Sequence, residues 1–185
     1  MQTEPGILVI AGPNGSGKST ITQKLEKIGI YINADDIRKH RGCTELKAAE
    51  EAEQIREQYL KEKQSFSFET VLSTGRNIHL LERAKKAGYY IKCVFVLTTN
   101  AELNVFRVKS RVSSGGHNVP VEKIRSRYKK SLKNIPNILA LCDECYIIDN
   151  TEEPVVVFAA NGAEQIITEN RFWSRKRIQV LIEEK

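Results

Sequence analysis

Short, uninterrupted apolar runs alternate along the chain with stretches in which apolar residues recur at every third or fourth position. The runs are too short and too continuous for amphipathic helices, so each predicts a β-strand. The expected strands span residues 7–11, 30–33, 65–71, 89–97 and 145–149. The helical spacing predicts helices at residues 17–28, from 35, at 44–64, 77–87 and 100–112, from 121, and at 138–142 and 172–183. Strands that alternate with helices indicate an α/β fold with a mostly parallel central sheet.

Two further apolar runs, at residues 155–160 and 163–168, are separated by Asn161 and Gly162. Asn-Gly favours tight two-residue turns, so this pattern predicts a C-terminal hairpin. A chain of 185 residues is expected to form a single domain, 1–185. Its core is expected at about residues 5–150, with the hairpin and a helix at 151–185.

The composition is ordinary for a soluble globular protein, with 41% hydrophobic and 28% charged residues. No apolar run approaches the roughly 20 residues that span a bilayer. The first residues lead straight into a predicted strand without the pattern of a signal peptide. We therefore expect a cytoplasmic protein without a membrane partner.

Positive charge is concentrated in one segment. Residues 104–134 hold nine lysines or arginines and one carboxylate, Glu122, so their local net charge of +8 exceeds the +6 of the whole chain. Such a segment implies an anionic partner, which could be nucleotide phosphates, a phosphorylated substrate or nucleic acid.

Residues 12–19, Gly-Pro-Asn-Gly-Ser-Gly-Lys-Ser, match the phosphate-binding P-loop pattern G-x-x-x-x-G-K-[ST]. They follow a predicted strand and open a predicted helix, as that motif requires. Glycines let backbone N–H groups cradle phosphates, Lys18 reaches the outer phosphates, and the Ser19 hydroxyl is our candidate magnesium ligand. The motif predicts a three-layer P-loop NTPase fold of the nucleotide-kinase type that binds ATP and Mg²⁺. The expected nucleotide-binding residues are Gly12, Pro13, Asn14, Gly15, Ser16, Gly17, Lys18, Ser19 and Thr20.

Two carboxylates stand at the ends of predicted strands, where the parallel arrangement brings side chains to the P-loop edge of the sheet. Asp35 is our candidate general base for an acceptor hydroxyl, and holding magnesium through a water molecule is its alternative role. Glu69 is expected to bind substrate or assist the metal, with packing or capping as the alternative. Helix capping is the competing explanation for the neighbouring Asp36. The candidate substrate residues are Asp36, Arg38, Glu69, Thr70 and Arg76.

Arginines of the basic segment are the candidates for stabilising a transferred phosphoryl group, because the guanidinium fork matches phosphate oxygens. Arg107 and Arg111 share one helix face, where their repulsion favours an intervening anion. Arg125 and Arg127 flank an apolar stripe on opposite sides, so periodicity leaves open which of them faces inward. Besides Asp35, the expected catalytic residues are Lys18, Arg111, Arg125 and Arg127.

No Asn-Lys-x-Asp guanine-reading motif is present, and only residues 146–149 have the form of a strand ending in a metal-binding aspartate. This pattern favours a kinase over a switch GTPase.

Four blocks in this order resemble the zeta-toxin-like branch of P-loop kinases: GPNGSGKST, INADDIRK, FETVLST and RVSSGGHNVPVEKIRSRYKKSLKN. The best-known members of that family are ATP-dependent kinases of UDP-N-acetylglucosamine. The resemblance implies that Lys18 binds ATP phosphates, that Asp35 is the general base and that Glu69 lies in the substrate pocket. It also implies that Arg111, with Arg127 or Arg125, stabilises the transferred phosphate. The implied partner is a nucleotide-sugar-like small molecule, and an antitoxin-like inhibitor is left open.

Two alternatives remain at this stage. A kinase of nucleosides or polynucleotide ends would use the basic segment along a nucleic-acid backbone. Aromatic side chains for base stacking are scarce there, with only Phe106 and Tyr128, so a nucleic-acid partner is not favoured. The second alternative is a non-catalytic, ATP-binding regulatory module.

Overall fold

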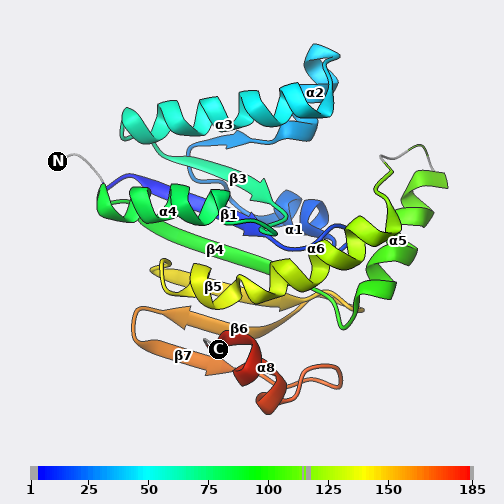
Figure 1. The fold of residues 1–185 in the computed structure, drawn as a ribbon. Coiled ribbons are helices and arrows are strands. Elements are labelled where there is room, and N and C mark those ends of the chain that lie inside the picture. The colour runs from blue at the N-terminus through cyan, green and yellow to red at the C-terminus, as the bar shows by residue number, and fades with distance from the viewer. Residues whose placement is uncertain (1–3, 114, 116–117, 184–185) are drawn as a thin grey trace.

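A single mostly parallel sheet organises the chain (Figure 1). The computed structural model describes residues 4–113, 115 and 118–183. Seven strands follow the order β2-β3-β1-β4-β5-β6-β7. Their bounds are β1 Gly6–Ala11, β2 Ile30–Ile32, β3 Phe66–Thr70, β4 Tyr90–Leu97, β5 Glu144–Asp149, β6 Val155–Asn161 and β7 Glu164–Ile167.

The strands from β2 to β5 are parallel, and β6 and β7 extend the sheet as an antiparallel hairpin. The predicted α/β fold with its C-terminal hairpin is therefore confirmed. In the register between β1 and β3, Ala11 lies opposite Thr70 and Ile10 opposite Glu69. The P-loop, which follows β1, thus emerges at the same sheet edge as Glu69.

Eight helices cover the sheet within the described residues. They are α1 Lys18–Lys24, α2 Ala34–Arg41, α3 Glu45–Lys61, α4 Arg76–Lys86, α5 Ala101–Ser113, α6 Val121–Lys133, α7 Ile135–Leu139 and α8 Arg175–Ile182. The odd-numbered residues of β1 face the main hydrophobic core, to which α3, α4, α7 and α8 contribute buried side chains. The even-numbered residues face a smaller cluster that Ile21 of α1 completes.

The first helix ends earlier than its apolar spacing predicts. Leu25 adopts extended backbone angles, so α1 stops at Lys24 instead of reaching residue 28. Leu25 and Ile28 nevertheless pack against the smaller cluster, because an extended segment keeps them under the sheet. Gly29 lies beyond the end of α1, directly before β2. It has a φ of +58°, and a Cβ atom there would lie 1.9 Å from the carbonyl oxygen of Ser65.

The short helix before β5 also differs from its prediction. It spans Ile135–Leu139 rather than residues 138–142, and Pro136 lies in its first turn, where proline is well tolerated. The buried face of α7 carries Ile135 and Ile138. The helix predicted at 172–183 is shorter in the structure: α8 begins after Ser174 and ends at Ile182.

Candidate active site

Close backbone approaches that only glycine permits hold the P-loop in shape. Gly12 has a φ of +141°, and a Cβ atom there would lie 2.1 Å from the carbonyl oxygen of Val96. Gly17 has a φ of +90°, and a Cβ atom there would lie 2.1 Å from Nδ2, the side-chain amide nitrogen of Asn150. That amide donates to the carbonyl of Ser16 at 2.7 Å, so the loop after β5 supports the P-loop. A side chain at either position would displace the loop, so both glycines preserve the backbone shape that a phosphate cradle requires.

Lys18, the first residue of α1, folds its ammonium group back over the loop. Its Nζ atom donates to the carbonyls of Gly12 at 2.7 Å and Pro13 at 3.1 Å. Burial lowers the pKa of Lys18 to about 8. Nearby charges act on this pKa in both directions: Glu69 and Asp35 raise it, and Arg111 and Arg127 lower it.

Glu69, on β3, is the centre of a hydrogen-bond network at the edge of the P-loop. Its Oε1 atom accepts from the Thr22 hydroxyl at 2.5 Å and from the Tyr31 hydroxyl at 2.8 Å. Its Oε2 atom accepts from the Ser19 hydroxyl at 3.4 Å. Burial and the Glu69 carboxylate both raise the pKa of Tyr31, so the phenol remains a donor at neutral pH. The network fixes the Glu69 carboxylate beside the candidate metal ligand.

The same network continues to Asp35. Asn33 donates from Nδ2 to the Tyr31 hydroxyl at 2.8 Å, and its Oδ1 atom accepts from the backbone N–H of Asp35, also at 2.8 Å. Asn33 is thereby the N-cap of α2, which begins at the end of β2. The Asp35 carboxylate is exposed and lines the same cavity as Lys18 and Glu69. One chain of contacts therefore joins the Glu69 carboxylate to the start of the helix that carries Asp35.

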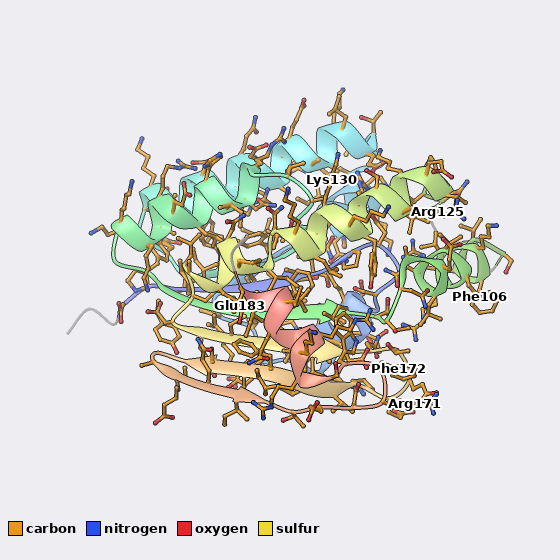
Figure 2. The ribbon with its side chains drawn as sticks, turned by 60° about the horizontal axis from the view of Figure 1, so that its bottom comes forward. Phe106, Arg125, Lys130, Arg171, Phe172 and Glu183 are labelled. Atoms are coloured by element: carbon orange, nitrogen blue, oxygen red, sulfur yellow. The ribbon has the colours of Figure 1, made fainter. Side chains whose placement is uncertain are left out.

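The two arginines that periodicity could not separate have different surroundings. Arg127 lines the cavity and donates to Asn14 Oδ1 at 3.2 Å. Arg125, labelled on α6 in Figure 2, pairs with Glu102 at 2.7 Å and with Glu122 at 2.8 Å. Those two carboxylates hold Arg125 outside the cavity. Of the two, Arg127 is the one that faces the P-loop.

A cavity of about 310 Å³ collects most of the predicted residues. Of the expected nucleotide-binding residues, Gly12, Pro13 and Ser16 are buried and do not line it. The cavity is lined by Asn14, Gly15, Gly17, Lys18, Ser19, Thr20, Asn33, Ala34, Asp35, Arg38, Glu45, Ala49, Glu69, Thr70, Val71, Arg111, Val119 and Arg127.

Two expected substrate residues are not brought to this cavity. Arg76 begins α4, where its exposed guanidinium pairs with Glu53 at 3.0 Å. Asp36 lines a separate groove on the other side of α2. Asn33 provides the side-chain cap of α2, and Asp36 lies in the first turn, where a carboxylate interacts favourably with the helix dipole. Thr70 does line the cavity, but its hydroxyl accepts from the backbone N–H of Leu72 at 2.9 Å and so also holds the following turn.

The oxygen atoms beside the P-loop fit the magnesium ion that the motif implies. Ser19 and Glu69 offer a hydroxyl and a carboxylate in one place, and Mg²⁺ prefers such hard ligands. Within the described residues, no group of three or more His, Cys, Asp or Glu side chains could hold a metal. This donor set suits an ion whose remaining ligands are phosphate oxygens and water.

Sequence reasoning missed Thr22, Tyr31 and Asn33. Each lies next to a predicted motif, but Thr22 and Tyr31 contact Glu69 only because distant strands pair, and Asn33 joins them through the Tyr31 hydroxyl. Tyr31 offered one signal, since it carries a polar hydroxyl in the short strand whose end leads to Asp35.

Among the described helices, none has the length and apolar character needed to cross a bilayer.

Comparison with known proteins places this chain in a family. A sequence model of the zeta toxin family matches residues 1–163. An uncharacterized protein of Haemophilus influenzae is 29% identical over 123 residues, which cover 63% of this chain and 88% of that protein.

Two solved structures share the fold. One comes from the PezAT toxin–antitoxin system of Streptococcus pneumoniae, with a TM-score of 0.64 at 17% identity over 99% of this chain and 89% of that chain. The other is the AvrRxo1-ORF1:-ORF2 complex with ATP, with a TM-score of 0.71 at 14% identity over 90% of this chain and 61% of that chain. Since the family model spans most of the sequence, this protein belongs to the zeta toxin family.

Proposed function

We propose that this protein is an ATP-dependent phosphotransferase that transfers the γ-phosphoryl group to a hydroxyl of a nucleotide-sugar-like acceptor. One observation carries the proposal: a carboxylate, Asp35, lines the same P-loop cavity as Lys18, Arg111 and Arg127. A base and several cations around one phosphate site are what phosphoryl transfer needs. The similar structure solved with ATP supports ATP as the donor.

Each residue of the cavity has its own role in the proposed reaction. Asp35 accepts the proton of the acceptor hydroxyl while that oxygen forms a bond to the γ-phosphorus. The bond between the γ-phosphorus and its bridging oxygen breaks, and ADP leaves with the bonding electrons. Arg111 and Arg127 stabilise the charge on the transferred group, and Lys18 binds the outer phosphates. Ser19, assisted by Glu69, would hold Mg²⁺, which neutralises phosphate charge when bound.

The acceptor is proposed from the walls of the cavity and from the family. Arg38, Glu69 and Thr70 line the cavity beside Asp35 and supply donors and acceptors suited to a polyhydroxylated substrate. Members of the zeta toxin family that are kinases of UDP-N-acetylglucosamine make this nucleotide sugar the first acceptor to test.

The decisive experiment incubates the purified protein with Mg²⁺ and labelled ATP and screens acceptors by mass spectrometry. The panel holds UDP-sugars, nucleosides and 5′-hydroxyl oligonucleotides. Asp35→Asn should abolish transfer while ATP binding persists, because the variant loses only the base. Lys18→Ala should weaken ATP binding as well. Asp36→Asn is the matched control, since it removes a neighbouring carboxylate that lies outside the cavity.

The outcomes separate the candidate functions. A phosphorylated UDP-sugar that depends on Asp35 and not on Asp36 supports the proposal. A labelled oligonucleotide would reassign the protein to nucleic-acid ends. Tight ATP binding without any phosphorylated product would favour a regulatory module.

A further inference from the structure

A second and larger concavity, of about 820 Å³, lies between α6–α7 and the C-terminal helix α8. It is separate from the P-loop cavity, although α6 borders both: Arg127 lines the first and Lys129 the second. Its size lies in the range of small-molecule sites. We call it the α6–α8 groove. Figure 2 shows α8 in front of the sheet, with Glu183 labelled at its end.

The walls of the groove are aliphatic. Leu132, Pro136, Val180 and Leu181 line it, and Val180 is 51% exposed. Two aromatic residues also line the groove, but Tyr128 is only 8% exposed and Trp173 only 1%. The Arg177 guanidinium lies over the Trp173 ring at 3.9 Å from its centroid. The walls therefore suit a flexible alkyl chain better than a flat ring that binds by stacking.

The rim of the groove is positive. Lys129 and Lys133 stand one turn apart on α6, where like charges repel by a few tenths of a kcal/mol. Within the part of the chain that the structure describes, neither lysine has a carboxylate partner, whereas Arg125 on the same helix has two. Arg177 donates to the backbone carbonyls of Thr99 at 2.7 Å and Phe172 at 2.6 Å, which are neutral, and among the described residues it forms no ion pair. Glu183 is the single acidic side chain among the lining residues.

We propose that the α6–α8 groove binds an amphipathic anion, a carboxylate carried on a medium-length acyl chain. The chain would replace water against Leu132, Val180 and Leu181, and the carboxylate would lie between Lys129 and Lys133. This site accounts for two of the lysines that make residues 104–134 strongly positive and that the P-loop cavity does not use. The proposal does not depend on phosphoryl transfer.

Ligand binding in the groove can be followed by the intrinsic fluorescence of the protein. Trp173 is the single tryptophan of the chain and lines the groove, so its emission should change as a ligand fills the groove. Decanoate is titrated into the full-length protein below its micelle concentration, and calorimetry measures the same binding independently. Saturable binding is expected, and shortening to octanoate should weaken it by up to about fourfold per methylene removed. Acetate, and a decyl chain with a trimethylammonium head, should not bind.

Charge substitutions then locate the site. Lys129→Glu and Lys133→Glu should each weaken decanoate binding about tenfold, since each replaces attraction by repulsion. Lys130→Glu is the matched control, because Lys130 is exposed on the same helix but does not line the groove (Figure 2).

Several results would overturn the proposal. One is the absence of heat and of an emission change with decanoate, and another is equal binding of the cationic decyl compound. Equal weakening by Lys130→Glu would show non-specific charge attraction. Concentration-dependent self-association that Lys129→Glu abolishes, without decanoate binding, would assign the groove to a second copy of the chain.

Discussion

At the scale of single residues, Lys18 meets two opposing requirements. Phosphate binding needs its ammonium charged, while burial lowers its pKa to about 8. The affinity for ATP should therefore fall as the pH rises through about 8, with the midpoint shifted upward once phosphate is bound. Binding measured by calorimetry between pH 6.5 and 9.5 tests this. In Lys18→Arg the decline should vanish, because a guanidinium stays charged; a decline that persists would locate the titration elsewhere.

The lowered pKa of Lys18 also predicts that burying its charged ammonium group destabilises the folded protein. Between pH 8 and 10.5, the unfolded chain binds a proton at Lys18 that the folded chain has lost, so the contribution of this group to stability rises with pH. Lys18→Met, which has no charge to bury, should raise the free energy of unfolding at pH 7 by up to about 3 kcal/mol. The advantage should shrink as the pH approaches 10.5. Urea denaturation of both proteins at pH 7 and 10 measures the difference; a constant gap would contradict the assigned pKa.

The hydrogen bonds of Tyr31 predict that it positions the site residues. It donates to Glu69 and accepts from Asn33, which caps the helix carrying Asp35. Tyr31→Phe should lower kcat about tenfold and leave the KM for ATP unchanged, because the nucleotide cradle is untouched. Tyr90→Phe, at the opposite end of the sheet, removes a hydroxyl bound to Glu144 and is the matched control. Equal kinetics of the two variants would remove Tyr31 from the site.

The residues that sequence reasoning placed correctly in the cavity belong to contiguous motifs. Lys18 and Ser19 follow from one eight-residue pattern, and Asp35 follows from its position after a strand. Thr22 and Tyr31 did not follow, because their partner Glu69 is 47 and 38 residues away and the contact requires strand pairing. The inward position of Arg127 was likewise undetermined until Glu102 and Glu122 were seen to hold Arg125.

At the scale of elements, the turn after β3 is strained and held by α6. Leu72 is buried with a φ of 55°, a conformation that costs a branched side chain about 1 to 2 kcal/mol. Ser131 donates to the carbonyl of Val71 at 2.7 Å, and Asn134 donates to that of Leu72 at 2.8 Å. Since Val71 lines the cavity, these bonds join α6 to the wall of the site.

Ser131→Ala should therefore lower the free energy of unfolding by about 1 to 3 kcal/mol, because it removes a donor from a buried contact. It should also slow transfer by loosening the turn beside the site. Ser113→Ala is the control, as its hydroxyl makes an exposed bond within α5. Urea denaturation and steady-state kinetics measure both effects; a loss no larger than that of Ser113→Ala would mean that the strained turn holds without α6.

Helix ends were the least predictable feature of the elements. The spacing of Ile21, Leu25 and Ile28 fits a helix to residue 28, yet α1 ends at Lys24 and the last two side chains reach the same cluster from an extended segment. Apolar spacing reports which side chains are buried, and two backbone conformations can bury them.

At the scale of the whole molecule, the alternation of strands and helices was sufficient to predict the α/β class and the parallel sheet. The strand order was not predictable, because it depends on which strands pair across crossovers. The role of the C-terminal segment was also hidden. Val157, Phe158, Trp173 and Ile178 join the main hydrophobic cluster, so the core extends well past residue 150.

The segment beyond the family match is therefore expected to stabilise the entire domain. Ile178 of α8 is fully buried in the main cluster and lies outside residues 1–163. Ile178→Ala should lower the free energy of unfolding by about 2 to 5 kcal/mol, since it deletes buried methyl groups and leaves a cavity. Val180→Ala, two residues away on the exposed side of α8, should change it by no more than about 0.5 kcal/mol.

Chemical denaturation followed by circular dichroism tests whether α8 unfolds together with the rest of the domain. A single cooperative transition that shifts as a whole in Ile178→Ala would show that α8 unfolds together with the sheet that carries the P-loop. A separate early transition, with the main one unchanged, would show instead that α8 is an appendage on a core completed without it. In that second case ATP binding should survive the early transition, because β1, β3 and the P-loop would remain folded.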